Sequence, residues 1–370
     1  MMASSRPANP PNPESSEPAP PQNLDNMPVE LFWQMTEHLP IEALTSLRTV
    51  SRGVSARALQ PFAQCGLSTL SMTLDAHGYD KVDEIANHEF YQKLPQRLAM
   101  YPPNAPCDSF WTDAALRKLG QTLAHQLAQC REVVLYYGAP DQADRMDDML
   151  SLHALCRMLA AGQIHLRRLV LFQRQAPERR RAPELLAWPR PYLPPNIASI
   201  WPELRQLHVY EPEDNAAIDY LRALLPMILQ NAAQLEDFKH VVSPRLFLRD
   251  YVIPVRGAIW AGEDESVVRG PAPLKRVEVV GTYINLADLM GFLGQYGPTL
   301  ERVQICVTYG HGSDARWSEV LAHMKEVCPV LRYVSVVTCR RSLGCVESED
   351  RDRMLEALDR MIEMAEHAGF

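Results

Sequence analysis

From residue 130 onward the chain repeats a six-residue phrase of the form L-x-x-L-x-L, in which apolar residues alternate after the first position. The phrase returns seven times, at residues 130–135, 166–171, 204–209, 235–240, 274–279, 300–305 and 331–336. Such alternation is typical of a strand with one buried face. Apolar residues in helical spacing fill the intervals, at 113–130, 149–162, 216–234, 286–296 and 316–328. The pattern predicts an α/β fold.

The recurring leucine phrase indicates a stack of related strand-helix units. Its starts lie 26 to 39 residues apart, longer and less regular than the 20 to 29 residues of standard leucine-rich repeats. We therefore predict an irregular leucine-rich-repeat-like solenoid over residues 113–370, with a last helix that carries Met354, Leu358, Met361 and Ala365 along one stripe as its cap. A doubly wound sheet is the alternative, because strands and helices alternate there as well.

Near the N-terminus, the positions of the prolines predict where three short helices begin and end. The first carries Leu31, Met35 and Leu39 at helical spacing and stops at Pro40. A second helix has an apolar stripe of Ile41, Leu44, Leu47 and Val50, and a third ends at Pro61. About 40 residues seldom fold alone without a metal, disulfides or a partner. We expect a second polypeptide to cover this apolar surface.

The stretch MPVELFWQMTEHLPIEALTSLRTVSR resembles an F-box, in the version found near the start of fungal proteins. The positions that match this pattern are Pro28, Glu30, Leu31, Met35, Leu39, Pro40, Leu44, Leu47, Val50, Ser51 and Arg52. Three positions depart from it: Met27, Thr36 and Val54. Thr36 brings a hydroxyl where the family has an apolar side chain, which puts the strength of the family interaction in question. The resemblance assigns residues 23–65 to an F-box and leaves 66–112 as a connecting segment.

The resemblance implies that the chain is the substrate-recognition subunit of an SCF-type cullin-RING ubiquitin ligase and not an enzyme. The F-box would bind the Skp-type adaptor through Pro28, Glu30, Leu31, Met35, Leu44, Leu47, Val50 and Arg52, and the repeat domain would bind a target protein for ubiquitin-dependent degradation. A scaffold unconnected with a ligase, whose N-terminal helices cap its own stack, is the alternative. It predicts that deleting residues 24–65 destabilises the rest.

Side chains between the leucines of the repeats would face the target. They include Arg168, His208, Lys239, Arg276, Arg302 and Tyr333. Any single one of them also fits a solvated sheet face.

Composition narrows the class of protein. The 370 residues carry a net charge of -8, which implies no nucleic-acid groove. No apolar run is long enough to span a membrane, and residues 1–22, with seven prolines, form a disordered tail without a secretory core. We expect a cytoplasmic or nuclear protein. Its eight dispersed cysteines include no C-x-x-C pair, so they predict mostly buried thiols.

One motif points to an enzyme. Gly310, Gly312 and Ala315 spell G-x-G-x-x-A between a predicted strand and a helix, as in dinucleotide-binding folds. The following strand ends without the acidic residue that would bind a ribose, so an α/β oxidoreductase remains a remote alternative. Neither a metal-ligand cluster nor a nucleophile motif appears, and we predict no cofactor and no metal.

Overall fold

A computed structural model of the chain describes residues 24–102, 112–137, 146–173, 193–211, 217–242, 272–311, 316–338 and 342–367. The chain divides into two compact units, residues 1–66 and 67–370. The tail predicted at residues 1–22 lies outside the described residues.

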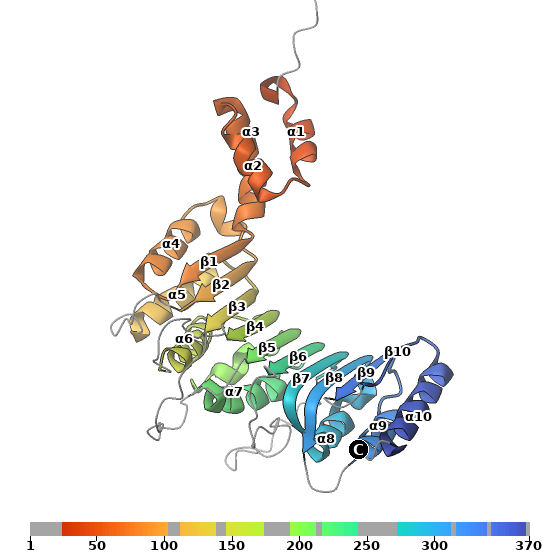
Figure 1. The fold of residues 1–370 in the computed structure, drawn as a ribbon. Helices are drawn as coiled ribbons and strands as arrows, with labels where there is room; N and C mark the ends of the chain where they lie inside the picture. The colour runs from red at the N-terminus through yellow and green to blue at the C-terminus, as the bar shows by residue number, and fades with distance from the viewer. Residues whose placement is uncertain are drawn as a thin grey trace, which may run out of the picture. The chain divides into compact units, whose positions relative to one another are not determined.

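The N-terminal unit consists of short helices (Figure 1). They are a 3₁₀ turn η1 (Leu24–Asn26) and the helices α1 (Val29–Thr36), α2 (Ile41–Arg48) and α3 (Arg52–Leu67). Pro28 and Pro40 precede α1 and α2 as their N-caps, where a missing N–H costs no helical hydrogen bond. The third helix was expected to end at Pro61, and this is wrong. Pro61 and Ala63 are both buried within α3, which continues to Leu67.

The second unit is built on one sheet of ten strands whose order along the sheet equals their order along the chain. Their bounds are β1 (Thr69–Thr73), β2 (Arg97–Tyr101), β3 (Glu132–Tyr137), β4 (Arg168–Gln173), β5 (Gln206–Glu211), β6 (Asp237–Val242), β7 (Arg276–Asn285), β8 (Arg302–His311), β9 (Tyr333–Thr338) and β10 (Ser342–Glu347). β1 to β9 are parallel, and β10 runs antiparallel to β9.

Helices connect most of these strands. They are α4 (Ala76–Ala86), α5 (Asp113–His125), α6 (Met146–Gly162), α7 (Ala217–Asn231), α8 (Leu286–Tyr296) and α9 (Trp317–Val327), with α10 (Arg351–His367) after the last strand and short turns η2 (Tyr91–Lys93), η3 (Ile197–Ile200) and η5 (Gly297–Thr299). Crossovers between parallel strands are right-handed, and here each one advances in the same direction along the sheet. All the crossover helices therefore cover one face, and they follow one another along it in Figure 1.

The core lies between the sheet and this helical layer. The first position of each of the seven phrases is buried just before a strand: Cys130, Leu166, Leu204, Leu235, Leu274, Leu300 and Leu331. Within the strands, alternate residues such as Val133 and Leu135 of β3 are buried under the helices, while Val134 and Tyr136 belong to the opposite face. The described part of the chain places no helix over that opposite face, which we call the open face.

The α/β class predicted from the sequence is confirmed, but the solenoid is wrong. The strands form a single sheet with an antiparallel last strand rather than a leucine-rich-repeat solenoid. The alternative of a doubly wound sheet is also wrong, because the strand order never reverses and the sheet has no switch point. The leucine phrase indicates only that each strand has one buried face. Several α/β architectures have such strands, so the phrase does not distinguish between them.

Strands missing from the sequence prediction lie at both edges of the sheet. The segment 66–112, expected to be a connection, contains β1, α4 and β2, and β1 and β2 belong to the same sheet as the predicted strands. β10 was not predicted either. The stripe of the last helix is as expected, because Met354, Leu358, Met361 and Ala365 of α10 are all buried.

Candidate functional site

The N-terminal unit has a small core of its own. Phe32 of α1 packs against Val54 and Ala58 of α3, and half-buried Met27 and Leu47 lie around them. Since Phe32 faces this core, the side chains next to it on the helix point elsewhere. Leu31 and Met35, which we expected a second polypeptide to cover, are therefore turned away from the core, whereas Leu39 follows the end of α1 and is half-buried.

Thr36 shares the inward face of α1 with Phe32, one turn further along. Its side chain is 1% exposed, and its hydroxyl donates to the carbonyl oxygens of Phe32 (2.9 Å) and Trp33 (3.1 Å). Both acceptors belong to the same helix, so the buried hydroxyl has its hydrogen bonds within the unit and needs none from a second protein. The departure from the F-box pattern at this position thus lies inside the unit and not on its surface.

The Val-Ser-Arg segment of the F-box-like pattern starts α3. Ser51 Oγ accepts a hydrogen bond from the backbone N–H of Val54 (3.0 Å), as a residue at a helix N-terminus does, and donates to Asp25 Oδ1 (2.7 Å). Further along α3, Arg57 donates to the carbonyl oxygens of Met27 and Leu24. These bonds tie the η1 turn and the start of α1 to α3.

Six of the eight residues predicted to bind an adaptor are exposed: Pro28, Glu30, Leu31, Met35, Val50 and Arg52. Leu44 is 1% exposed and Leu47 is half-buried against the Phe32 cluster, so these two support the fold of the unit.

Exposed apolar side chains are concentrated in this unit. Leu31 (54% exposed), Met35 (42%), Val50 (63%), Trp33 and Leu59 make up five of the nine large hydrophobic residues that are exposed in the described chain. The unit contributes only residues 24–66 to that chain. Trp33 and Leu59 were missed from the sequence because the helical stripes were drawn through other positions.

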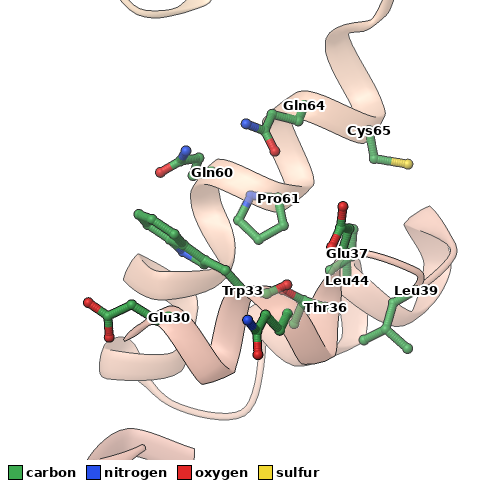
Figure 2. Close-up of a pocket in the computed structure, with 11 residues that line it drawn as sticks. Glu30, Trp33, Thr36, Glu37, Leu39, Leu44, Gln60, Pro61, Gln64 and Cys65 are labelled. Atoms are coloured by element: carbon green, nitrogen blue, oxygen red, sulfur yellow. The ribbon is translucent and has the colours of Figure 1, made fainter. Parts of the chain in front are cut away.

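Beside these residues lies a pocket of about 580 Å³. Its lining includes Trp33 of α1, Leu44 of α2, and Pro61 and Cys65 of α3, which Figure 2 shows around it. Polar side chains, Glu30 and Gln60 among them, line it as well. A pocket of mixed lining suits a side chain that is apolar along its length and polar at its end.

The open face of the sheet in the second unit carries two rows of side chains that run across the strands. The first, which we call the polar row, is fixed by the strand register and consists of Arg97, Glu132, Arg168, Gln206, Asp237, Arg276, Arg302 and Tyr333. Positive and negative groups alternate along parts of it.

Ion pairs follow from this alternation. Glu132 Oε2 lies 2.9 Å from Arg97 Nη2 and 3.7 Å from Arg168 Nη1, so two cations share one carboxylate. Asp237 Oδ2 lies 3.5 Å from His208 Nε2. Burial raises the pKa of Asp237, but the interaction with the His208 ring and the charge of Arg276 outweigh burial and hold that pKa below its usual value.

The second row, which we call the aromatic row, consists of Tyr101, Tyr136, Phe172 and Tyr210 near the carboxyl ends of β2 to β5. Tyr101 and Tyr136 stack with ring centroids 4.6 Å apart, and the next two steps along the row are 5.5 and 5.4 Å. Lys239 Nζ lies 5.6 Å from the centroid of the Tyr210 ring and 2.8 Å from Glu278 Oε1. Burial lowers the pKa of Lys239, but Glu278 outweighs this effect and raises it.

All six residues predicted to face a target lie on the open face. Arg168, Arg276, Arg302 and Tyr333 belong to the polar row, while His208 and Lys239 are register neighbours between the two rows. The sequence reading missed the aromatic row. Its signal was present, because an aromatic residue lies four positions after the first residue of each of the four strands β2 to β5.

The described residues offer little for enzyme chemistry. Gly310 lies inside strand β8, paired with Ile284, and not in a turn between strand and helix, while Gly312 and Ala315 lie outside the described residues. The first glycine of the motif thus lies in the strand, and the turn predicted after it falls outside the described residues and stays a prediction. In the described ranges, three or more His, Cys, Asp or Glu side chains nowhere gather as metal ligands. A helix long and apolar enough to cross a membrane is likewise missing from these ranges.

Comparisons with known proteins identify no relative. No protein-family model matches the chain, and a search of curated proteins finds no match.

Proposed function

We propose that the chain is the substrate-receptor subunit of an SCF-type ubiquitin ligase, acting in the cytoplasm or nucleus without an active site of its own. The observation that carries the proposal is the concentration of exposed apolar side chains on the N-terminal unit, in the segment that resembles an F-box. An exposed apolar surface of this kind, next to a pocket, is typical of an interface with another protein.

The geometry of α1 separates folding from binding. Phe32 and Thr36 serve the core of the unit, whereas Leu31 and Met35, four residues apart, lie together on the outward side of the same helix. These two side chains are the anchors for an adaptor groove, with Trp33 at the neighbouring pocket. Catalysis is then left to the partner complex, which brings a ubiquitin-charged enzyme close to the bound target.

A pull-down with a purified Skp-type adaptor tests this function. We expect the wild-type chain to retain the adaptor, and Leu31→Asp plus Met35→Asp to weaken retention by roughly 30-fold or more, because a carboxylate would be buried without a partner in the interface. Met364→Asp is the matched control, since Met364 is 48% exposed on α10 in the other unit and its replacement should leave retention unchanged.

Two outcomes count against the function. Failure of the wild-type chain to retain any Skp-type adaptor contradicts the ligase assignment. Equal retention by the double variant shows that Leu31 and Met35 do not anchor the adaptor. Circular dichroism of the double variant must match the wild type, as expected for exposed positions.

A further inference from the structure

The aromatic row and the polar row together form a surface on the open face that neither the fold nor the ion pairs explain. Phe172 is 38% exposed in the middle of the aromatic row. The four neighbouring rings, of which Tyr101 and Tyr136 stack and the others are tilted, offer a platform about four strands wide on a sheet face that no described helix covers. We propose that this platform binds an extended, proline-containing segment of a partner protein in the polyproline II conformation, with acidic side chains directed to the polar row.

The spacing of the rings favours polyproline II over an extended β segment. Neighbouring strands lie about 4.8 Å apart and the successive ring centroids 4.6, 5.5 and 5.4 Å apart, so every second ring recurs at about 10–11 Å. Three residues of polyproline II advance about 9.3 Å, which brings equivalent positions of successive turns close to alternate rings. In a β segment, side chains on one face recur at about 6.7 Å, which matches neither the single nor the double strand spacing.

Hydrogen bonding points the same way. In β2 to β5 the backbone N–H and C=O groups are used by the ladders to neighbouring strands, so the open face offers a peptide no backbone partner for strand addition. A polyproline II chain requires none, because it has no internal hydrogen bonds and keeps its backbone solvated. Aromatic side chains that pack against proline rings are how such chains are bound elsewhere, and a tyrosine hydroxyl can donate to their carbonyl groups.

Charge complementarity determines the sign of the partner. The described open face carries five basic side chains on β2 to β10, which are Arg97, Arg168, Lys239, Arg276 and Arg302, against the four acidic side chains Glu132, Asp237, Glu278 and Glu347, the last of which lies 3.2 Å from Arg302. On β2 to β5, beside the aromatic row, Arg97 and Arg168 share the single carboxylate Glu132. This positive excess lies within a chain of net charge -8.

Arg168 is under-satisfied within this excess. Its Nε has no hydrogen-bond partner, and its Nη1 is 3.7 Å from the carboxylate that it shares with Arg97. The polar row lies four residues before the aromatic row in each strand, about 13 Å away. A glutamate on the bound segment and an arginine of the row span this distance together.

The inference rests on the proposed function, because it names the class of target segment that the receptor would capture. It can still fail independently, since peptide binding requires no adaptor. The probes are a fluorescein-labelled (Glu-Pro-Pro)₄ peptide, a (Glu-Gly-Ser)₄ peptide of equal length and charge, a (Lys-Pro-Pro)₄ peptide, and a 12-nucleotide oligothymidylate, all measured by fluorescence anisotropy with the full chain.

We expect (Glu-Pro-Pro)₄ to bind at least 10-fold more tightly than the other three probes, and Phe172→Ala to weaken its binding by at least 10-fold. Phe90→Ala is the control variant, because Phe90 is 39% exposed outside the sheet and its loss should change nothing. Arg168→Gln should weaken binding of (Glu-Pro-Pro)₄ and leave binding of an uncharged Pro-rich peptide of the same length unchanged.

Four results overturn the inference: no measurable binding of (Glu-Pro-Pro)₄, equal binding of (Glu-Gly-Ser)₄, preference for the lysine peptide, or Phe172-dependent binding of the oligonucleotide, which would make the row a base-stacking platform. Loss of folding in Phe172→Ala is checked by circular dichroism. If it occurs, Phe172→Leu, which keeps an apolar side chain but removes the ring, must reproduce the 10-fold weakening, and wild-type affinity in that variant also overturns the inference.

Discussion

Two glycine-to-alanine changes are expected to have opposite effects on stability, one at the contact between α5 and α6 and one on the exposed side of α8. Gly120 of α5 faces Gly162 of α6 at a point where the two backbones meet. A Cβ added to Gly120 would lie 2.4 Å from the carbonyl oxygen of Met158 and 3.0 Å from the backbone nitrogen of Gly162. Gly294 of α8 is exposed, and a Cβ there would lie 3.5 Å from His323 Nε2, an ordinary contact.

The magnitudes follow from these distances. At Gly120 the obstructing atoms are backbone, so no side chain can rotate away and α5 and α6 must separate by about 1 Å. Overpacking of this kind costs about 1–3 kcal/mol, against a gain of about 1 kcal/mol in helix propensity. We expect Gly120→Ala to lower the free energy of unfolding by about 1 kcal/mol, and by about 2 kcal/mol if the helices cannot relax. Gly294→Ala should raise it by about 0.5–1 kcal/mol, since only the propensity changes.

Urea denaturation followed by circular dichroism measures both changes through the transition midpoint at constant slope. The wild type and the two variants are compared in the same buffer. A midpoint for Gly120→Ala that rises as much as that of Gly294→Ala would refute the close approach of α5 and α6.

Three further outcomes are expected. Burial raises the pKa of the thiols of Cys130, Cys156 and Cys328 to about 12. Alkylation at pH 8, followed by mass spectrometry, should therefore leave these three unmodified until the protein is unfolded, while exposed Cys65 and Cys345 react. Equal labelling of all five cysteines would contradict this. Because the folded pKa of Asp237 is lowered, its contribution to stability is present above about pH 4 and is lost as the pH falls below that value. Asp237→Asn should therefore flatten the acid side of the stability profile, and an unchanged profile would exclude the effect. Phe32→Ala should destabilise the N-terminal unit by about 3–5 kcal/mol and Leu31→Ala by much less, measured by hydrogen exchange of α1 and α3 amides; equal losses would place both side chains in the core.

The sequence predicted the seven strands β3 to β9 because a buried leucine or cysteine precedes each of them and alternation follows. The prediction started the repeat at Cys130 and so missed β1, although Leu67, Leu70 and Met72 carry the same phrase there. Whether such units curve into a solenoid or continue as one sheet depends on how neighbouring units pack. A pattern of one buried face per strand carries no information on that packing.

The candidate site shows the same limit in one helix. On α1, Leu31 and Met35 form one stripe four residues apart, and Phe32 and Thr36 form another. Periodicity alone cannot choose between them. The choice is made by Val54 and Ala58 of α3, whose small side chains leave room for the Phe32 ring, and by the two carbonyl oxygens that satisfy the Thr36 hydroxyl.

The sequential order of the strands affects how this chain can change its length. Each strand hydrogen-bonds only to strands adjacent to it in the sequence, so the two outer edges of the sheet never meet. Duplication or loss of one strand together with its helix would alter two junctions and leave all other pairings intact. Gene rearrangement can thus widen or narrow the aromatic platform by whole steps of about 4.8 Å, and with it the number of ligand turns that the protein accommodates.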